Sequence, residues 1–228
     1  HVSMDYYPNK AKQKIRKSLK NILKINHPSI LRSLFFSKHG FGGESRPTLI
    51  TEYNTNLSLN HIITNGTKID QWNATKKLIC IYGIASGMSY LHSHKIYHLN
   101  LNTENIIFDA NFYPKIKDFG LKGTFKSLKT LARIIEISPY TAPEIYHNSE
   151  YNEGSEVYSY SMIIYAILNN KLPFEEVSKI DMIKNIENDI KPPFNPEIPE
   201  EYQNLIKRCW SNDPKNRPSF SQIVEELE

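Results

Sequence analysis

Two stretches near the start and middle of the sequence show apolar residues at helical spacing. The first predicts an amphipathic helix over about residues 10–25, with a stripe of lysine and arginine on another face. The second predicts a longer helix from Asp70, the expected N-cap, to about His94. The apolar sides of the two helices are expected to consist of Ile15, Leu19, Ile22 and Leu23, and of Leu78, Ile81, Ala85, Met88 and Leu91.

Three further helices are predicted in the second half of the chain. Residues 155–169 are apolar nearly all round, which indicates a buried helix. Two more helices fit residues 200–210 and 219–227, and Ser219 is the expected cap of the second.

Strand signals are short and few. The stretch PTLITEY, residues 47–53, is apolar and rich in β-branched residues, as strands are. Residues 106–108 and 114–119 predict two more short strands joined by a turn. A few strands followed mostly by helices indicate an α+β fold.

The composition indicates a globular protein. The chain has 228 residues, 39% of them hydrophobic and 23% charged, which is enough for a buried core. Its net charge of +4 is too small to imply a nucleic-acid partner. Cys80 and Cys209 both fall in apolar helical patterns, so we expect buried thiols. The sequence contains no apolar run long enough to cross a bilayer, so a cytoplasmic location is expected.

Four motifs in one order carry a family resemblance. YHLNLNTEN at residues 97–105 precedes KDFG at 117–120 and YTAPE at 140–144, and RCWSNDPKNRPSF follows at 208–220. This set resembles the catalytic loop, the metal-binding Asp-Phe-Gly, the Ala-Pro-Glu and the late arginine of protein kinases. The residues of these motifs are similar to those of the tyrosine-kinase-like group, and to its protist members in particular.

The resemblance implies a bilobal protein-kinase fold for residues 1–228 as a single domain. It places a reduced, β-rich small lobe at about residues 1–54 and a mostly helical large lobe at about residues 55–228. The glycine cluster at residues 39–45 follows the first predicted helix and precedes a strand. We therefore interpret it as a turn between strands and not as the family's glycine-rich cover over the phosphates.

Several positions that bind phosphate in the family are changed here. Met4 stands where the resemblance places the strand lysine, and Ser18 where it places the helix glutamate. Residues 10–24 contain no acidic residue at all, so the lysine–glutamate pair of active kinases is not expected to form.

The catalytic loop is altered at three positions. His98 matches the family's histidine, whereas Leu99 replaces the arginine, Asn100 the catalytic aspartate and Asn102 the lysine. An asparagine amide is nearly isosteric with a carboxylate but does not accept a proton at working pH. Leu99 cannot pair with a phosphorylated activation segment as arginine does.

Other family positions are kept. Asn105 and Asp118 match the Mg²⁺ ligands, with a purely structural role in turns as the alternative. Thr51 resembles the gatekeeper, and Glu52 and Tyr53 resemble the hinge of the adenine pocket. Because the phosphate-binding positions are changed, we expect that the protein requires no cofactor. The positions that are kept would allow weak binding of ATP and Mg²⁺.

A second set of matches concerns folding. Glu144 and Arg217 resemble the buried ion pair of the large lobe. Glu156 replaces the usual aspartate of the buried helix and adds a methylene, which puts its contact with the loop backbone in question. His98, Phe119 and Ile22 resemble the apolar stack between the lobes.

The pattern predicts a pseudokinase that acts by binding proteins, such as an active kinase or its substrate, as scaffold, competitor or allosteric regulator in signalling. The alternative is an atypical Ser/Thr kinase that uses displaced residues. Its substitute lysine would be Lys10, Lys12 or Lys115, and its substitute base Asp109 or Glu104. A third hypothesis is that the basic first helix binds an anionic surface, although we expect no membrane and no nucleic acid as partners.

Overall fold

The computed structural model describes residues 9–37, 48–54, 57–65, 71–120, 138–148 and 151–228. Its helices are α1 (Asn9–Ile22), α2 (Leu59–Asn65), α3 (Ala74–Ser93), α6 (Pro143–Asn148), α7 (Glu153–Asn169), α8 (Lys179–Glu187), α9 (Glu200–Cys209) and α10 (Phe220–Leu227). Two 3-10 helices cover Thr103–Asn105 and Pro214–Asn216. The strands are β1 (Ser33–Ser37), β2 (Thr48–Thr51), β3 (Ile106–Phe108) and β4 (Pro114–Ile116).

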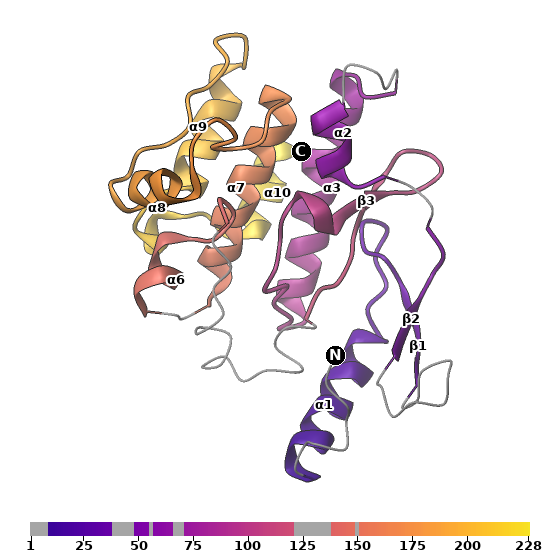
Figure 1. The fold of residues 1–228 in the computed structure, drawn as a ribbon. Helices are drawn as coiled ribbons and strands as arrows, with labels where there is room; N and C mark the ends of the chain where they lie inside the picture. The colour runs from indigo at the N-terminus through magenta and orange to yellow at the C-terminus, as the bar shows by residue number, and fades with distance from the viewer. Residues whose placement is uncertain (1–8, 38–47, 55–56, 66–70, 121–137, 149–150) are drawn as a thin grey trace.

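The described elements form two parts of unequal size (Figure 1). The N-terminal part, residues 9–54, contains α1 and an antiparallel pair of β1 and β2. The helical part, residues 57–228, contains the other helices and an antiparallel hairpin of β3 and β4, in which Ile106 lies opposite Ile116. This arrangement agrees with an α+β, kinase-like architecture.

One hydrophobic core joins the two parts. It includes Leu19 of α1, Met88 of α3, Ile163 of α7 and Ile223 of α10, all at most 1% exposed. Three of the four residues predicted for the apolar side of α1, Ile15, Leu19 and Ile22, are buried, whereas Leu23 is half-buried and lies just beyond the end of the helix. The predicted wholly buried helix is confirmed as α7, whose N-terminus is closed by a capping box between Asn152 and Ser155. The predicted cap Ser219 of α10 also forms a capping box, with Gln222.

Two predictions for the long helix α3 are wrong. The helix is capped by Asn73, whose side chain accepts a hydrogen bond from the backbone N–H of Lys76, whereas Asp70 lies outside the described residues. Leu78 is 43% exposed instead of buried. The buried residues of α3 begin at Cys80 and Ile81.

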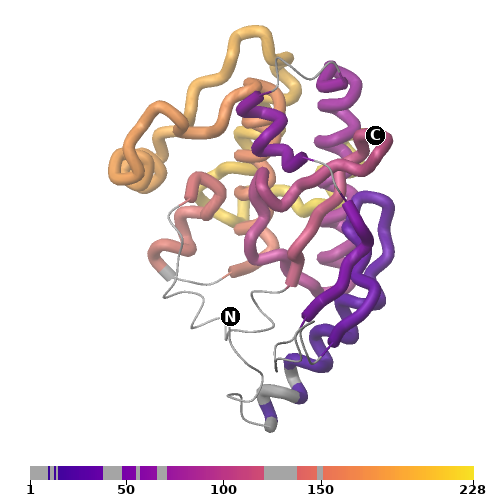
Figure 2. The backbone as a smooth tube through the Cα atoms, turned by 45° about the vertical axis from the view of Figure 1, so that its right-hand side comes forward, coloured from indigo at the N-terminus to yellow at the C-terminus, as the bar shows by residue number. Residues whose placement is uncertain are grey.

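Close approach fixes α3 against β4. A Cβ at Gly83 would lie 2.7 Å from Pro114 Cγ, and a Cβ at Gly87 would lie 2.8 Å from Ile116 Cδ1. Real Cβ atoms do not approach other atoms so closely, so the packing of this helix on the hairpin depends on two glycines one turn apart. Figure 2 shows α3 running alongside the β3–β4 hairpin.

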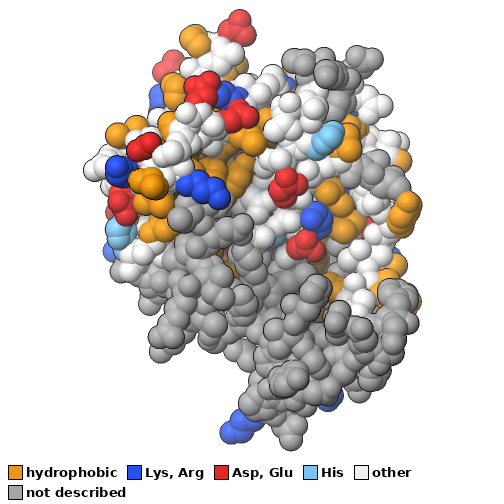
Figure 3. All heavy atoms as spheres, viewed as in Figure 1, with side chains coloured by type: hydrophobic (Ala, Val, Ile, Leu, Met, Phe, Trp, Pro, Cys, Tyr) orange, Lys and Arg blue, Asp and Glu red, His pale blue; other side chains and the backbone are white. Residues whose placement is uncertain are grey.

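The surface mixes apolar and charged side chains. Val177, Ile180 and Ile190 are exposed near α8, and Figure 3 shows hydrophobic side chains interleaved with charged ones on that side of the molecule. No helix among the described residues is both long and apolar enough to cross a membrane. Both cysteines are buried, as predicted, and burial raises the pKa of both thiols.

Candidate functional site

The loop from His98 to Asn105 connects α3 to β3 and forms the centre of the candidate site. Its first residue, His98, is fully buried, and burial lowers the pKa of the imidazole. The ring is therefore neutral, and its Nδ1 lies 3.3 Å from the backbone nitrogen of Asn100, which donates to it. His98 thus positions the loop backbone as a neutral acceptor.

Three asparagines hold one another in this loop. The backbone carbonyl of Asn100 accepts hydrogen bonds from Nδ2 of Asn102 at 3.1 Å and from Nδ2 of Asn105 at 2.8 Å. The side chain of Asn102 also caps the 3-10 helix by accepting from the backbone N–H groups of Glu104 and Asn105. The position at which the family resemblance expects a lysine therefore has a structural role here.

Leu99 has a left-handed backbone, with φ of +65°. Its N–H donates to Glu156 Oε1 over 2.6 Å, and Oε2 of the same carboxylate lies 2.7 Å from His92 Nε2. Both Glu156 and His92 are buried. The contact that the added methylene put in question is therefore present, and the longer side chain joins the loop to α3 as well as to α7.

The two predicted metal ligands lie in different surroundings. Asn105 is buried, and the bond from its Nδ2 to the Asn100 carbonyl leaves Oδ1 as the remaining acceptor of its amide. Asp118 has φ of +62°, and its side chain is 52% exposed. Lys117 places its ammonium 3.2 Å from Asp118 Oδ2. The described residues contain no cluster of three or more side chains that could hold a metal by themselves.

Asn105 and Asp118 fit Mg²⁺ only if the phosphates of a bound nucleotide supply further oxygen ligands. Mg²⁺ favours hard oxygen ligands and is commonly bound through one or two carboxylates together with the phosphates of a substrate. Asn105 and Asp118 would supply one amide oxygen and one carboxylate. The Lys117 ammonium already offsets the charge of that carboxylate, so the site attracts a cation less strongly than a lone aspartate would.

The residues after Asp118 link this site to α1. Phe119 and Ile22 are both 3% exposed, and a Cβ at Gly120 would lie 3.4 Å from Ile22 Cδ1. His98 lies at the same point, since its backbone oxygen accepts from the N–H of Gly120 at 3.4 Å. These contacts agree with the apolar stack that the resemblance implies.

The predicted adenine-pocket residues lie at and just beyond the end of β2. Thr51 and Tyr53 are exposed, Tyr53 to 88%. Glu52 bonds to Arg32 twice, with its N–H donating to the Arg32 carbonyl at 2.9 Å and its Oε1 accepting from the Arg32 N–H at 3.1 Å. Ser18 is half-buried on α1, and Met4 lies outside the described residues, as does the glycine cluster.

The structure gives three of the proposed substitute residues other contacts. Asp109 Oδ1 accepts from the backbone N–H groups of Asn111 and Tyr113 and so shapes the turn between β3 and β4. Glu104 is exposed, and its Oε2 accepts from the Ser58 hydroxyl at 3.0 Å. Lys115 lies 3.9 Å from Glu52 Oε1.

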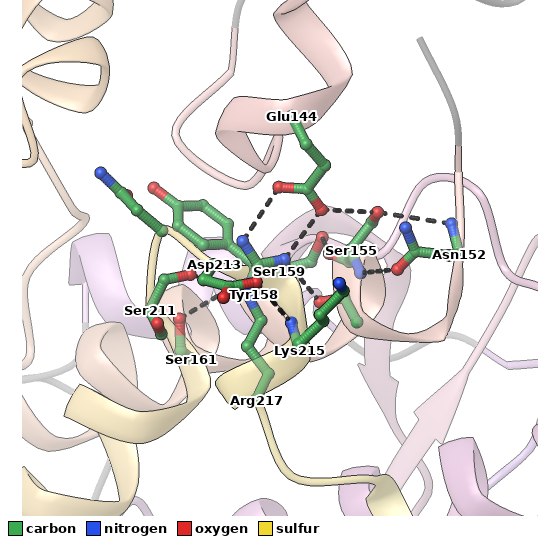
Figure 4. A network of polar contacts seen from close by, with 12 residues as sticks. Glu144, Asn152, Ser155, Tyr158, Ser159, Ser161, Ser211, Asp213, Lys215 and Arg217 are labelled. Carbon is green, nitrogen blue, oxygen red and sulfur yellow. Dashed lines mark hydrogen bonds and ion pairs between the residues drawn. The ribbon is translucent and has the colours of Figure 1, made fainter. Parts of the chain in front are cut away.

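An ion pair anchors the far side of the helical part (Figure 4). Arg217 binds Glu144 through two parallel bonds, Nη1 to Oε1 at 2.8 Å and Nη2 to Oε2 at 2.9 Å. The guanidinium also donates to the carbonyls of Ser211 and Gly154, and Ser155 Oγ donates to Glu144 Oε1. The predicted pair is therefore present, and its fork geometry joins α6, α7 and the segment before α10.

The match to a family model decides the family. The sequence matches the model of protein tyrosine and serine/threonine kinases over residues 2–227. The chain belongs to the protein kinase family. The domain is 31% identical over 216 residues to the probable serine/threonine-protein kinase drkD of Dictyostelium discoideum, a match that covers 94% of this chain and 16% of that protein.

Two further relatives have kinase names. The dual specificity protein kinase pyk3 of Dictyostelium discoideum is 32% identical over 219 residues, covering 95% of this kinase domain and 16% of the relative. Human mitogen-activated protein kinase kinase kinase 13 is 27% identical over 226 residues, covering 96% of the domain and 22% of the relative. The kinase domain thus spans less than a quarter of the length of these relatives.

One charged residue of this kinase domain was missed by sequence reasoning. Lys117 was not among the substitute lysines, yet its ammonium lies 3.2 Å from Oδ2 of the predicted metal ligand Asp118, the next residue in the sequence. Its position in KDFG was the available signal. The structure brings Asn100, Asn102 and Asn105 together as one neutral network, and it places Lys115 beside Glu52.

Proposed function

We propose that this kinase domain is a pseudokinase of the tyrosine-kinase-like group, which acts by binding other proteins in signalling. The observation that carries the proposal is the asparagine network of the loop. Asn100 stands where the family places its proton acceptor, and its amide is neutral. Asn102, at the lysine position, caps the 3-10 helix and supports the same loop.

The magnitudes favour impaired catalysis. General-base assistance contributes about 10²–10⁴ in rate, so its loss alone leaves a slow enzyme. Phosphoryl transfer depends further on cations that stabilise the transferred phosphate. Ser18 on α1 offers no carboxylate to hold a phosphate-binding lysine, and Met4 offers no cation. The combined loss is larger than either change alone.

The persistence of the folding residues supports a binding role. The Glu144–Arg217 pair and the Glu156 contacts hold the helical part together. A domain that keeps its framework and loses its transfer chemistry suits a scaffold, a competitor for an active kinase's substrate, or an allosteric regulator. We propose one domain over residues 1–228, with the lobes divided at about residue 54.

Nucleotide binding is a separate part of the proposal. Thr51, Glu52 and Tyr53 form the proposed adenine-pocket edge, and Asn105 and Asp118 are residual ligands for Mg²⁺. The domain needs neither ATP nor Mg²⁺ for a scaffolding role. A thermal shift with ATP, in the presence and absence of Mg²⁺, measures whether nucleotide binds.

The names of the relatives favour a second candidate, an active Ser/Thr or dual-specificity protein kinase. Of the relatives above, drkD is named a probable serine/threonine-protein kinase and pyk3 a dual specificity protein kinase. The position of Lys117 offers that candidate a cation beside Asp118. Such an enzyme would still need a base other than Asn100.

A phosphate-transfer assay separates the two candidates. Purified domain is incubated with γ-labelled ATP, Mg²⁺ or Mn²⁺, and a general protein substrate, alongside Asp118→Ala. We expect no transfer above the Asp118→Ala background. Transfer that disappears in Asp118→Ala would establish the active kinase and reject the pseudokinase. Asn100→Asp alone is expected to leave transfer at background, because the carboxylate restores only one of the missing groups.

A further inference from the structure

A groove lies where α3 meets the β3–β4 hairpin, and its lining includes no residue of the loop from His98 to Asn105. Its volume is about 770 Å³, within the range of cavities that bind small molecules. Ile81 and Gly83 of α3 belong to its lining and are buried, so the groove reaches down to the core. Tyr202 of α9 and Leu227 of α10 line it too, and Figure 2 shows the C-terminal end on the side of the hairpin.

The walls of the groove are apolar and aromatic. Leu78, Tyr82 and Tyr113 all line it, and they are 43%, 37% and 47% exposed. Apolar side chains that gather around one concavity commonly mark a binding surface.

The rim of the groove is held in place by its own contacts. The ammonium of Lys76 lies 4.5 Å from the centroid of the Tyr113 ring and donates to the Asn111 carbonyl at 2.8 Å. On the other wall, the hydroxyl of Tyr82 donates to Glu228 Oε1 at 3.1 Å. A groove whose aromatic walls are already positioned loses little side-chain entropy when a ligand enters.

Two charged residues line the groove, and they differ in how far other contacts already occupy their charged groups. Asp109 lines it, but its Oδ1 accepts two backbone N–H groups of the turn. Lys115 lines the same groove, and its ammonium lies 3.9 Å from Glu52, at the outer limit of an ion pair. Its charge extends to His27, whose pKa is lowered by burial and then by Lys115. Lys115 is thus the cation among the residues that line the groove.

We propose that the groove binds a small amphiphilic anion, with its apolar tail along α3 and its carboxylate on the ammonium of Lys115. The apolar walls of the groove bury the tail of the ligand, and each buried methylene improves affinity about fourfold. The carboxylate competes with Glu52 for Lys115. Because Glu52 belongs to the proposed adenine-pocket edge, occupation of the groove is coupled to that edge. The inference does not depend on whether the domain transfers phosphate.

Calorimetric titration with sodium decanoate and with the uncharged decan-1-ol tests the proposal. We expect one saturable site for both, and tighter binding of decanoate. Lys115→Gln is expected to weaken decanoate about tenfold, the loss of one charge-assisted bond, and to leave decan-1-ol unchanged. Glu52→Gln should strengthen decanoate two- to fivefold, because an exposed ion pair that competes with it is removed.

Two variants complete the experiment. Leu78→Glu places a carboxylate on an exposed part of the apolar wall and should abolish binding of decanoate with little effect on the melting temperature. Lys117→Gln, two positions from Lys115 and outside the groove lining, should leave both affinities unchanged. The absence of saturable decanoate binding, equal affinities that ignore Lys115→Gln, or full binding in Leu78→Glu would each overturn the proposal.

Discussion

The Glu144–Arg217 anchor and the loop of Asn100 both lie in the helical part, but they satisfy their polar groups in different ways. The anchor uses opposite full charges, with an arginine side chain that is fully buried. The loop uses neutral amides that bond to backbone groups. Removal of Arg217 or Glu144 leaves its charged partner buried and unpaired, whereas the bonds among the three asparagines involve no charged group. The comparison teaches that a buried ion pair joins the helices of this part, while neutral amides hold the loop together and Glu156 binds its Leu99 N–H.

Arg217→Met should break the anchor and give the largest effect. It leaves Glu144 without its bidentate partner, and loss of one member of a buried ion pair typically costs about 3–5 kcal/mol of unfolding free energy. Urea unfolding measures this cost. Arg208→Met, which breaks the exposed pair with Glu226, is the matched control and should cost at most about 1 kcal/mol. Similar small losses in both variants would contradict the role given to the anchor.

Substitutions of Glu156 test how far a buried carboxylate supports the loop, whose other bonds are between neutral groups. Glu156→Ala leaves the N–H of Leu99 and the ring of His92 without their partner and should cost about 2–4 kcal/mol. Glu156→Gln keeps an acceptor for Leu99 and should cost about 1 kcal/mol. Chemical denaturation of both variants measures the difference, and equal losses would show that only packing matters at this position.

The pH dependence of stability tests the contribution of His98, the buried first residue of the loop. Burial lowers the pKa of His98 in the folded state, so below pH 6.5 the unfolded chain binds a proton that the folded chain resists. Stability is therefore full above the unfolded pKa and falls by about 1.4 kcal/mol per pH unit below it, until the folded pKa is reached. Melting curves between pH 5 and 7.5 should show a shallower slope for His98→Phe than for wild type. An unchanged slope would assign the titration to other histidines.

Asn102 gives the smallest expected effect. Asn102→Ala removes the cap of the 3-10 helix and should cost about 1 kcal/mol. Asn102→Lys, which restores the residue type of active kinases, should cost a similar amount because lysine cannot accept from the N–H groups of Glu104 and Asn105. Thermal unfolding of both variants checks this, and a stabilising Asn102→Lys would reverse the structural assignment.

The long periodic segments of the fold and the short strands β2, β3 and β4 could be predicted from the sequence, whereas β1 and α2 could not. The core-facing residues of α1 and the buried α7 follow from apolar spacing alone. Strand β1 was missed because Leu34 and Phe35 are exposed and give no clean alternation. Helix α2 was missed because its seven residues include two isoleucines, two asparagines and a threonine and so carry little helical signal.

For the candidate site, the sequence supplied residue types and the structure supplied their contacts. The replacements at Asn100 and Asn102 could be read from the motif. The turn that brings Lys117 onto Asp118 could not, because it depends on a left-handed backbone at Asp118. The second partner of Glu156 was also hidden, since His92 lies 64 positions away and meets it only through the packing of α3 on α7.

The two glycines of α3 have a consequence for the groove. Because Gly83 and Gly87 carry no Cβ, Pro114 and Ile116 pack closely against α3, and residues of both the helix and the hairpin line the proposed anion groove. A methyl group at either glycine would push the hairpin away from the helix and would thereby change the shape of that groove.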